Sequence, residues 1–256
     1  MKTRFLLADR PTVTVMVQAR TPKRAMELIG RGLDGGADAF GVQLEQLERE
    51  YHTPQVLTEL FRAANGNPIY VTNYRTGINA GRTDSDLASE LLLAADCGAT
   101  LIDIMGDLYC PNAKQLTDDS EAIDQQMKLI GQLHQKGAEV LISSHTFCFE
   151  TAERVMAMVA EQHRRGADIC KVVTAAGTPS ELAENFCASA ELARLEYPSL
   201  FLCVGDYCGR HRRVAPLLSN SLFLCVTEHD ELATPAQPLL KDARRLADTV
   251  FTGKDV

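Results

Sequence analysis

The chain has 256 residues, of which 45% are hydrophobic and 23% charged, and its formal net charge is -8 at pH 7. This composition is typical of an ordinary globular protein and argues against a general nucleic-acid-binding protein, which needs a basic surface. A small anionic ligand stays compatible with it, because one local arginine can hold a carboxylate.

The N-terminal stretch predicts neither a signal peptide nor a membrane span. "MKTRFLLADR" holds only the short apolar run FLL, whereas a signal peptide needs about 7–15 apolar residues and a membrane helix about 18. The eight cysteines form no CxxC pair, which favours reduced thiols over disulfides or a metal cluster. We therefore expect a cytoplasmic protein with no membrane partner.

Short apolar runs rich in Val, Ile, Leu and Phe recur along the chain and predict eight strands buried on both faces. They are expected at residues 12–19, 39–45, 68–75, 100–106, 138–146, 167–176, 199–206 and 221–228.

Amphipathic segments between these runs predict helices. Three of them open with a Thr-Pro pair, at Thr21, Thr178 and Thr234, where threonine is a good N-cap and proline suits the first helical position. A fourth spans 119–137 and stops at Gly137. The segments GGADAF, CGATLI, KGAEVL and RGADIC form a weak internal repeat, in which a helix-ending glycine and a small residue precede a strand.

Eight strand–helix units of roughly 30 residues predict a parallel α/β fold, which at about 250 residues closes as a (β/α)8 TIM barrel. An open doubly wound sheet is the alternative, but no GxGxxG motif follows the first strand. No linker or low-complexity stretch divides the chain, so we expect residues 1–256 to form a single domain.

Lys171 stands in the middle of the apolar strand "ADICKVVTAA". An unpaired buried charge is costly, and burial disfavours the charged form of an amine. The neutral amine is a nucleophile that forms imines with ketones and aldehydes. The alternative is a structural lysine paired with a barrel carboxylate such as Asp103 or Asp206.

The preceding strand ends in "ISSHTF", which places His145 at the same rim as Lys171. A histidine beside an imine can remove an acidified proton and return it to a leaving group. Other polar residues at strand ends allow a competing hypothesis of a divalent-metal site, although no motif such as HxH or HExxH supports it. The ligands of that site would be Asp103, His145, Asp206 and Glu228.

"SSHTF" followed by "RRGADICKVV" resembles the paired signature of type I 3-dehydroquinate dehydratases. The resemblance implies a (β/α)8 barrel without cofactor or metal, a homodimer, and conversion of 3-dehydroquinate to 3-dehydroshikimate in the shikimate pathway. It also implies that Lys171 forms a Schiff base with the C3 ketone. His145 would then take a proton from C2 and help the C1 hydroxyl leave as water.

Other positions match the family in part. The resemblance implies that Arg213 in "VGDYCGRHRR", with Arg212 as an alternative, binds the substrate carboxylate. Gln237 in "ATPAQ" matches the last active-site loop, while the family's serine there is Ala233. Arg75 in "TNYR" matches the arginine that ends the third strand, with a shift of one residue.

The sequence departs from the family pattern at charged residues that, in the family, face the ring hydroxyls of the substrate and orient the histidine. Gly41 and Asn79 stand where the family has glutamates, and Met105 replaces a third. Gln43 stands at a family arginine, and Glu45 at a family aspartate. We therefore expect a keto carboxylate ligand, with 3-dehydroquinate itself a poor substrate.

Two alternatives follow from these departures. One is an imine-forming lyase or aldolase with another keto acid, and the other is a weakened barrel with a binding or regulatory role. Restoring the family pattern with Gly41→Glu, Gln43→Arg and Asn79→Glu is expected to raise the rate if the backbone is unchanged.

Overall fold

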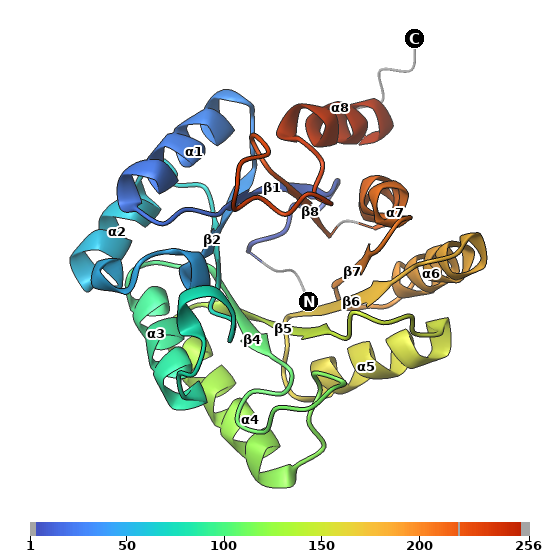
Figure 1. Cartoon of the computed structure of the whole chain (residues 1–256), viewed down its shortest axis with the longest axis horizontal. Helices are drawn as coiled ribbons and strands as arrows, with labels where there is room; N and C mark the ends of the chain where they lie inside the picture. The colour runs from blue at the N-terminus through green and yellow to red at the C-terminus, as the bar shows by residue number, and fades with distance from the viewer. Residues whose placement is uncertain (1–3, 220, 252–256) are drawn as a thin grey trace.

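The computed structural model describes residues 4–219 and 221–251, and in this part of the chain eight parallel strands form a nearly closed barrel inside eight helices (Figure 1). The strands are β1 (Thr12–Val17), β2 (Ala39–Gln43), β3 (Ile69–Thr72), β4 (Leu101–Met105), β5 (Glu139–His145), β6 (Ile169–Ala175), β7 (Ser199–Val204) and β8 (Leu222–Cys225). The helices are α1 (Pro22–Asp34), α2 (Pro54–Arg62), α3 (Asp84–Asp96), α4 (Ser120–Gln135), α5 (Ala152–Arg164), α6 (Pro179–Leu192), α7 (Cys208–Val214) and α8 (Leu240–Phe251). The predicted TIM barrel is confirmed.

The strands pair in the order β7-β6-β5-β4-β3-β2-β1-β8, each parallel to its neighbours. Among the described residues no pairing joins β7 to β8, so a seam lies between these two strands. Each of the eight strands lies within its predicted range, so the apolar runs located them correctly.

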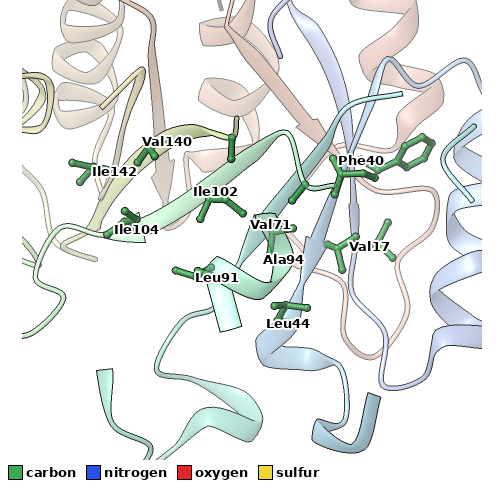
Figure 2. Close-up of a cluster of buried hydrophobic side chains, with 14 of the residues drawn as sticks. Val17, Phe40, Leu44, Val71, Leu91, Ala94, Ile102, Ile104, Val140 and Ile142 are labelled. Carbon is green, nitrogen blue, oxygen red and sulfur yellow. The ribbon is translucent and has the colours of Figure 1, made fainter. Parts of the chain in front are cut away.

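The two largest apolar clusters among the described residues hold the barrel together. The larger lies between the strands and the surrounding helices, and Figure 2 shows part of it, with Val71 of β3 and Ile102 of β4 beside Leu91 and Ala94 of α3. The smaller fills the barrel interior with alternate strand residues such as Leu101, Leu141 and Ile169. Side chains of a strand alternate between its two faces, so every second residue points into the barrel interior, including the residues at the carboxyl ends of the strands.

The N-terminal segment also enters this interior. Phe5 is buried against the ring of Tyr70, with 6.3 Å between ring centroids, and its backbone N–H donates to Glu139 Oε2 at 2.9 Å. An aromatic side chain at this position fills part of the barrel interior below the carboxyl ends of the strands.

The loops from helices into strands follow the predicted repeat. Gly36, Gly98, Gly137 and Gly166 all have positive φ, between 74° and 104°, a conformation that glycine adopts without a steric penalty. Thr21 and Thr178 cap α1 and α6 as predicted, each accepting a backbone N–H on its side chain.

The prediction of a helix beginning at Thr234 is wrong, because α8 begins at Leu240. Residues before it extend the sheet instead: Val226 bridges Leu239, and Leu240 N donates to Val226 O at 2.7 Å. Thr234 N donates to Gln18 Oε1 at 3.2 Å. These contacts hold residues 234–239 as a loop over the end of the barrel.

No helix in the described ranges is both long and apolar enough to cross a bilayer. All eight cysteines fall within these ranges and are free thiols.

Candidate active site

A cavity of ≈ 580 Å³ opens at the carboxyl ends of the strands. Inward-facing residues from the strand ends line it, together with residues of the following loops and of α7. Lys171 lies at its inner end, 4% exposed, and this inner end is called the floor below. The position agrees with the general placement of active sites in TIM barrels.

Three oxygen atoms surround the amine of Lys171. Its Nζ donates to Tyr74 OH at 2.7 Å and to Tyr70 OH at 3.0 Å, and lies 3.2 Å from Asp103 Oδ2. β5 and β6 pair in a register that places Ser143 opposite Lys171. The amine is therefore held at a fixed point by two tyrosines from β3 and the residues just after it, and by one aspartate from β4.

Asp103 is the centre of this network. Its Oδ2 accepts from both tyrosine hydroxyls, with Tyr74 at 2.5 Å, and its Oδ1 accepts from Ser143 Oγ at 2.5 Å. Lys171 thus forms an ion pair with Asp103. This is the pairing with a barrel carboxylate that was expected if the lysine is structural and not a nucleophile. Asp206 is exposed and does not line the cavity.

The two readings of the lysine are compatible. A protonated imine carries its positive charge on the same nitrogen as the ammonium, so one carboxylate stabilises both. The ion pair with Asp103 is therefore compatible with a nucleophilic role of this nitrogen.

His145 ends β5 on the same face as Ser143 and lines the cavity above Lys171. Burial, together with the charges of Lys171 and Arg212, lowers the pKa of His145 well below its usual range. The imidazole is therefore neutral near pH 7 and can accept a proton. The rings of Tyr74, edge-on at 5.1 Å between centroids, and Phe147, stacked at 6.0 Å, hold it.

Arg212, the alternative to Arg213, lines the cavity. It is 6% exposed, and its Nε donates to Cys203 O at 2.9 Å. Arg213 is exposed, donates to Gly209 O at 2.8 Å and does not reach the cavity. The two residues are adjacent on α7, so a turn of about 100° per residue sends one side chain inward and the other to the surface.

Arg212 is also a buried cation with no carboxylate partner among the described residues. Burial lowers the pKa of its guanidinium. An unpaired buried charge is costly, and a bound anion in the cavity would offset that cost.

The other expected binding residues divide into two groups. Gln237 and Gln43 line the cavity, and Gln237 Oε1 is a buried acceptor without a partner in the described structure. Arg75 also lines it, but ion pairs with Asp84 and Asp107, both at 2.7 Å, already hold its guanidinium.

Asn79 does not line the cavity. It is buried and donates to Asn73 Oδ1 at 2.7 Å and to Tyr74 O at 2.8 Å. This position does not support the prediction of Asn79 as a binding residue: η3 (Gly77–Asn79) turns its side chain toward the loop that follows β3, where it holds the backbone of Tyr74.

The hypothesis of a metal site is not supported. Across residues 4–219 and 221–251, no three His, Cys, Asp or Glu side chains gather closely enough to hold an ion. Glu228, one of the expected ligands, pairs instead with Arg24 and Arg31 on α1.

Tyr70 and Tyr74 were missed as site residues by the sequence analysis. Both lie two residues from Thr72 in "PIYVTNYR", so strict alternation along β3 could have placed them on the interior face. Tyr74 continues this alternation past the end of β3 and lines the cavity beside Arg75.

Three comparisons place this geometry among known proteins. A family model described as "Type I 3-dehydroquinase" matches residues 13–254. The search of curated proteins found no match.

Solved structures of similar fold include three 3-dehydroquinate dehydratases. The Geobacillus kaustophilus structure has a TM-score of 0.81 at 15% identity, covering 97% of this chain and 94% of that one. The Clostridium difficile structure, a type I 3-dehydroquinate dehydratase with covalently modified comenic acid, has a TM-score of 0.79 at 16% identity, covering 96% and 95%. The Enterococcus faecalis structure has a TM-score of 0.73 at 16% identity, covering 95% of each chain.

Proposed function

Since the chain belongs to the type I 3-dehydroquinase family and is therefore a carbon–oxygen lyase, we propose that it removes water from a cyclic keto carboxylate through an imine on Lys171. The substrate is 3-dehydroquinate, with 3-dehydroshikimate as product, or a close analogue. The enzyme acts in the cytoplasm as a homodimer and needs no metal or cofactor.

One observation carries this proposal: a buried lysine, a neutral histidine and an unpaired buried arginine line the same cavity. Each matches one requirement of the reaction. The lysine supplies the nucleophile, the histidine accepts a proton from carbon, and the arginine binds the carboxylate.

The reaction begins when the Lys171 amine attacks the ketone and water leaves, which gives a protonated imine. The positive nitrogen draws electrons and acidifies the adjacent C–H bond, whose proton His145 takes. The electron pair of that bond then expels the hydroxyl on the next carbon, and His145 returns its proton to the departing oxygen. Hydrolysis of the imine releases the product and restores the lysine.

The lining of the cavity favours a substrate with fewer hydroxyls than 3-dehydroquinate. Beside the polar groups named above, six apolar side chains from five strands or their ends face it: Met16, Met105, Val173, Leu202, Val204 and Leu224. Loss of a charged partner for a polar substrate group commonly costs ~2–5 kcal/mol. We therefore expect turnover of 3-dehydroquinate well below the ~10 s⁻¹ median of enzymes.

The test is borohydride reduction in the presence of 3-dehydroquinate, followed by mass spectrometry of the protein and its peptides. Borohydride converts the imine into a stable amine, so the added mass maps to the peptide that contains Lys171. Lys171→Ala removes the adduct, whereas Lys136→Ala, which changes a surface lysine paired with Asp96, keeps it.

An adduct on another lysine, or undiminished turnover in Lys171→Ala, contradicts the proposal. Efficient wild-type dehydration of 3-dehydroquinate contradicts only the altered specificity. If no imine forms with any keto acid, the barrel is a binding protein and not an imine-forming lyase.

A further inference from the structure

We infer that Tyr74 is a catalytic residue that exchanges protons with the substrate oxygen while the imine forms and breaks. This inference rests on the proposed function, because it assumes that Lys171 is the nucleophile.

The first argument is access. Tyr70, Tyr74 and Asp103 all contact Nζ of Lys171, at 3.0, 2.7 and 3.2 Å. Of these three residues only Tyr74 lines the cavity; Tyr70 is fully buried and Asp103 is 1% exposed. A carbonyl group that reaches Nζ from the cavity therefore meets the hydroxyl of Tyr74 first.

The second argument is connection. The hydroxyl of Tyr74 accepts from Nζ and donates to Asp103 Oδ2 at 2.5 Å. A proton that leaves the amine can pass to this oxygen while the phenol proton moves on to the carboxylate. The reverse transfer uses the same two hydrogen bonds. Tyr74 thus joins the carboxyl group of Asp103, at the floor, to the space that the substrate oxygen occupies.

The protonation state of the phenol suits this role. Burial, with the charge on Asp103, raises the pKa of Tyr74 well above its usual range. The hydroxyl therefore keeps its proton at rest and acts as a donor toward oxygen, with Asp103 as the store from which its proton is replaced.

The bond changes balance as follows. The Lys171 ammonium passes one proton through Tyr74 to Asp103, and the freed lone pair attacks the carbonyl carbon. The carbonyl oxygen takes a proton from Tyr74, which regains one from Asp103, and this gives a protonated carbinolamine. The carbinolamine nitrogen then gives one proton through Tyr74 to Asp103. The carbinolamine hydroxyl takes a proton back from Tyr74 and leaves as water, while the nitrogen lone pair forms the C=N bond. Ketone and ammonium thereby become protonated imine and water.

This assignment leaves His145 for the carbon centre. Its ring lies edge-on to Tyr74 at 5.1 Å between centroids, farther up the cavity than the floor network. The two proton transfers, at oxygen during imine formation and at carbon during elimination, then belong to different residues.

The test measures imine formation by quenched flow, with 3-dehydroquinate as probe and borohydride as quench, and follows the adduct mass on Lys171. Tyr74→Phe is expected to slow imine formation at least ~10²-fold, the usual scale for loss of a general acid or base. The matched control is Tyr70→Phe, which removes a hydroxyl from the same Asp103 oxygen and the same amine, and which is expected to slow it less than ~10-fold.

Two further measurements separate proton transfer from positioning. Tyr74→Gln keeps a donor for Asp103 but cannot relay a proton, and we expect it to be as slow as Tyr74→Phe. Added imidazole, a small diffusible acid and base, should speed the Tyr74 variants in proportion to its concentration and leave Tyr70→Phe unaffected.

Near-native rates in Tyr74→Phe, or recovery in Tyr74→Gln without added imidazole, would overturn the inference while the Lys171 adduct keeps the proposed function standing. If both tyrosine variants slow equally and imidazole has no effect, the hydroxyls only position the lysine and the inference is likewise overturned. A wild-type protein that gives no adduct on Lys171 overturns the proposed function and this inference together.

Discussion

At the scale of the residue, His145 owes its reactivity to its surroundings. Burial of the ring, together with the cations Lys171 and Arg212, lowers its pKa and keeps it neutral, which suits the base of the proposed reaction. We expect His145→Ala to slow turnover by ~10²–10⁴ and to leave the borohydride-trapped imine on Lys171 intact. Steady-state rates check the loss of turnover, and the adduct mass, measured on the same preparation, checks that the imine still forms. Near-native turnover would remove His145 from the mechanism.

The adjacent arginines of α7 offer a matched pair for the anion site. Arg212 lines the cavity and Arg213 lies on the surface. We expect Arg212→Ala to raise KM for a keto carboxylate by ~30-fold or more, since loss of a charged partner costs at least ~2 kcal/mol. Arg213→Ala should leave KM within a factor of about two. Equal effects in the two variants would place the carboxylate elsewhere.

At the scale of the element, side chains of β1 and β3 pack so closely over Gly41 of β2 that a larger residue there must displace them. A Cβ at Gly41 would lie 2.4 Å from Met16 Sδ and 3.0 Å from Tyr70 Cδ1. We therefore expect Gly41→Glu to lower the free energy of unfolding by about 1–3 kcal/mol through overpacking, and not to raise the rate. Urea denaturation measures this change.

The control for that variant is Gly30→Ala in α1, where an added Cβ meets nothing within 4 Å. Alanine favours a helix, so this change should stabilise the protein by about 0.5–1 kcal/mol. A Gly41→Glu protein as stable as the wild type would show that Met16 moves aside freely, and would reopen the earlier expectation for the triple variant.

The elements were the part of the structure that the sequence predicted best. The eight strands were found because all are buried on both faces and therefore read as continuous apolar runs. The start of α8 was missed because Thr234-Pro235 has the local chemistry of a helix cap, whereas the bridge between Val226 and Leu239 depends on contacts that no local pattern contains.

For the candidate site, the sequence indicates those residues that line the cavity where residue type and strand position coincide. Lys171 and His145 stand out as polar residues in or after apolar strands. Arg212 and Arg213 have the same side chain, and only the rotation of α7 separates them. Tyr74 carries no such signal, because its contact with the floor network depends on Asp103, which is distant in sequence.

At the scale of the whole molecule, Glu45 links stability to pH. It is 2% exposed, Thr72 Oγ1 donates to it at 2.9 Å, and burial raises its pKa from 4.5 to about 7. Between these two values the unfolded chain loses the proton while the folded protein keeps it. Stability is therefore greatest below pH 4.5 as far as this group is concerned, and falls by about 3 kcal/mol as pH rises to 7.

We expect Glu45→Gln to remove this fall. Unfolding free energies from urea titrations between pH 5 and pH 8 should decline with pH in the wild type more steeply than in the variant. Glu27→Gln, which changes an exposed residue of α1, is the control and should follow the wild-type curve. Parallel curves for the wild type and Glu45→Gln would show that Glu45 ionises normally in the folded protein.

The floor of the cavity also sets how long the proposed intermediate lasts. An ammonium group has three hydrogens, and the three oxygen atoms around Nζ of Lys171 match that number. A protonated imine has one hydrogen on its nitrogen, so two of these three acceptors lose their donor when the substrate is attached. The floor therefore forms more hydrogen bonds with the free lysine than with the adduct, and this difference favours hydrolysis of the imine and release of the product.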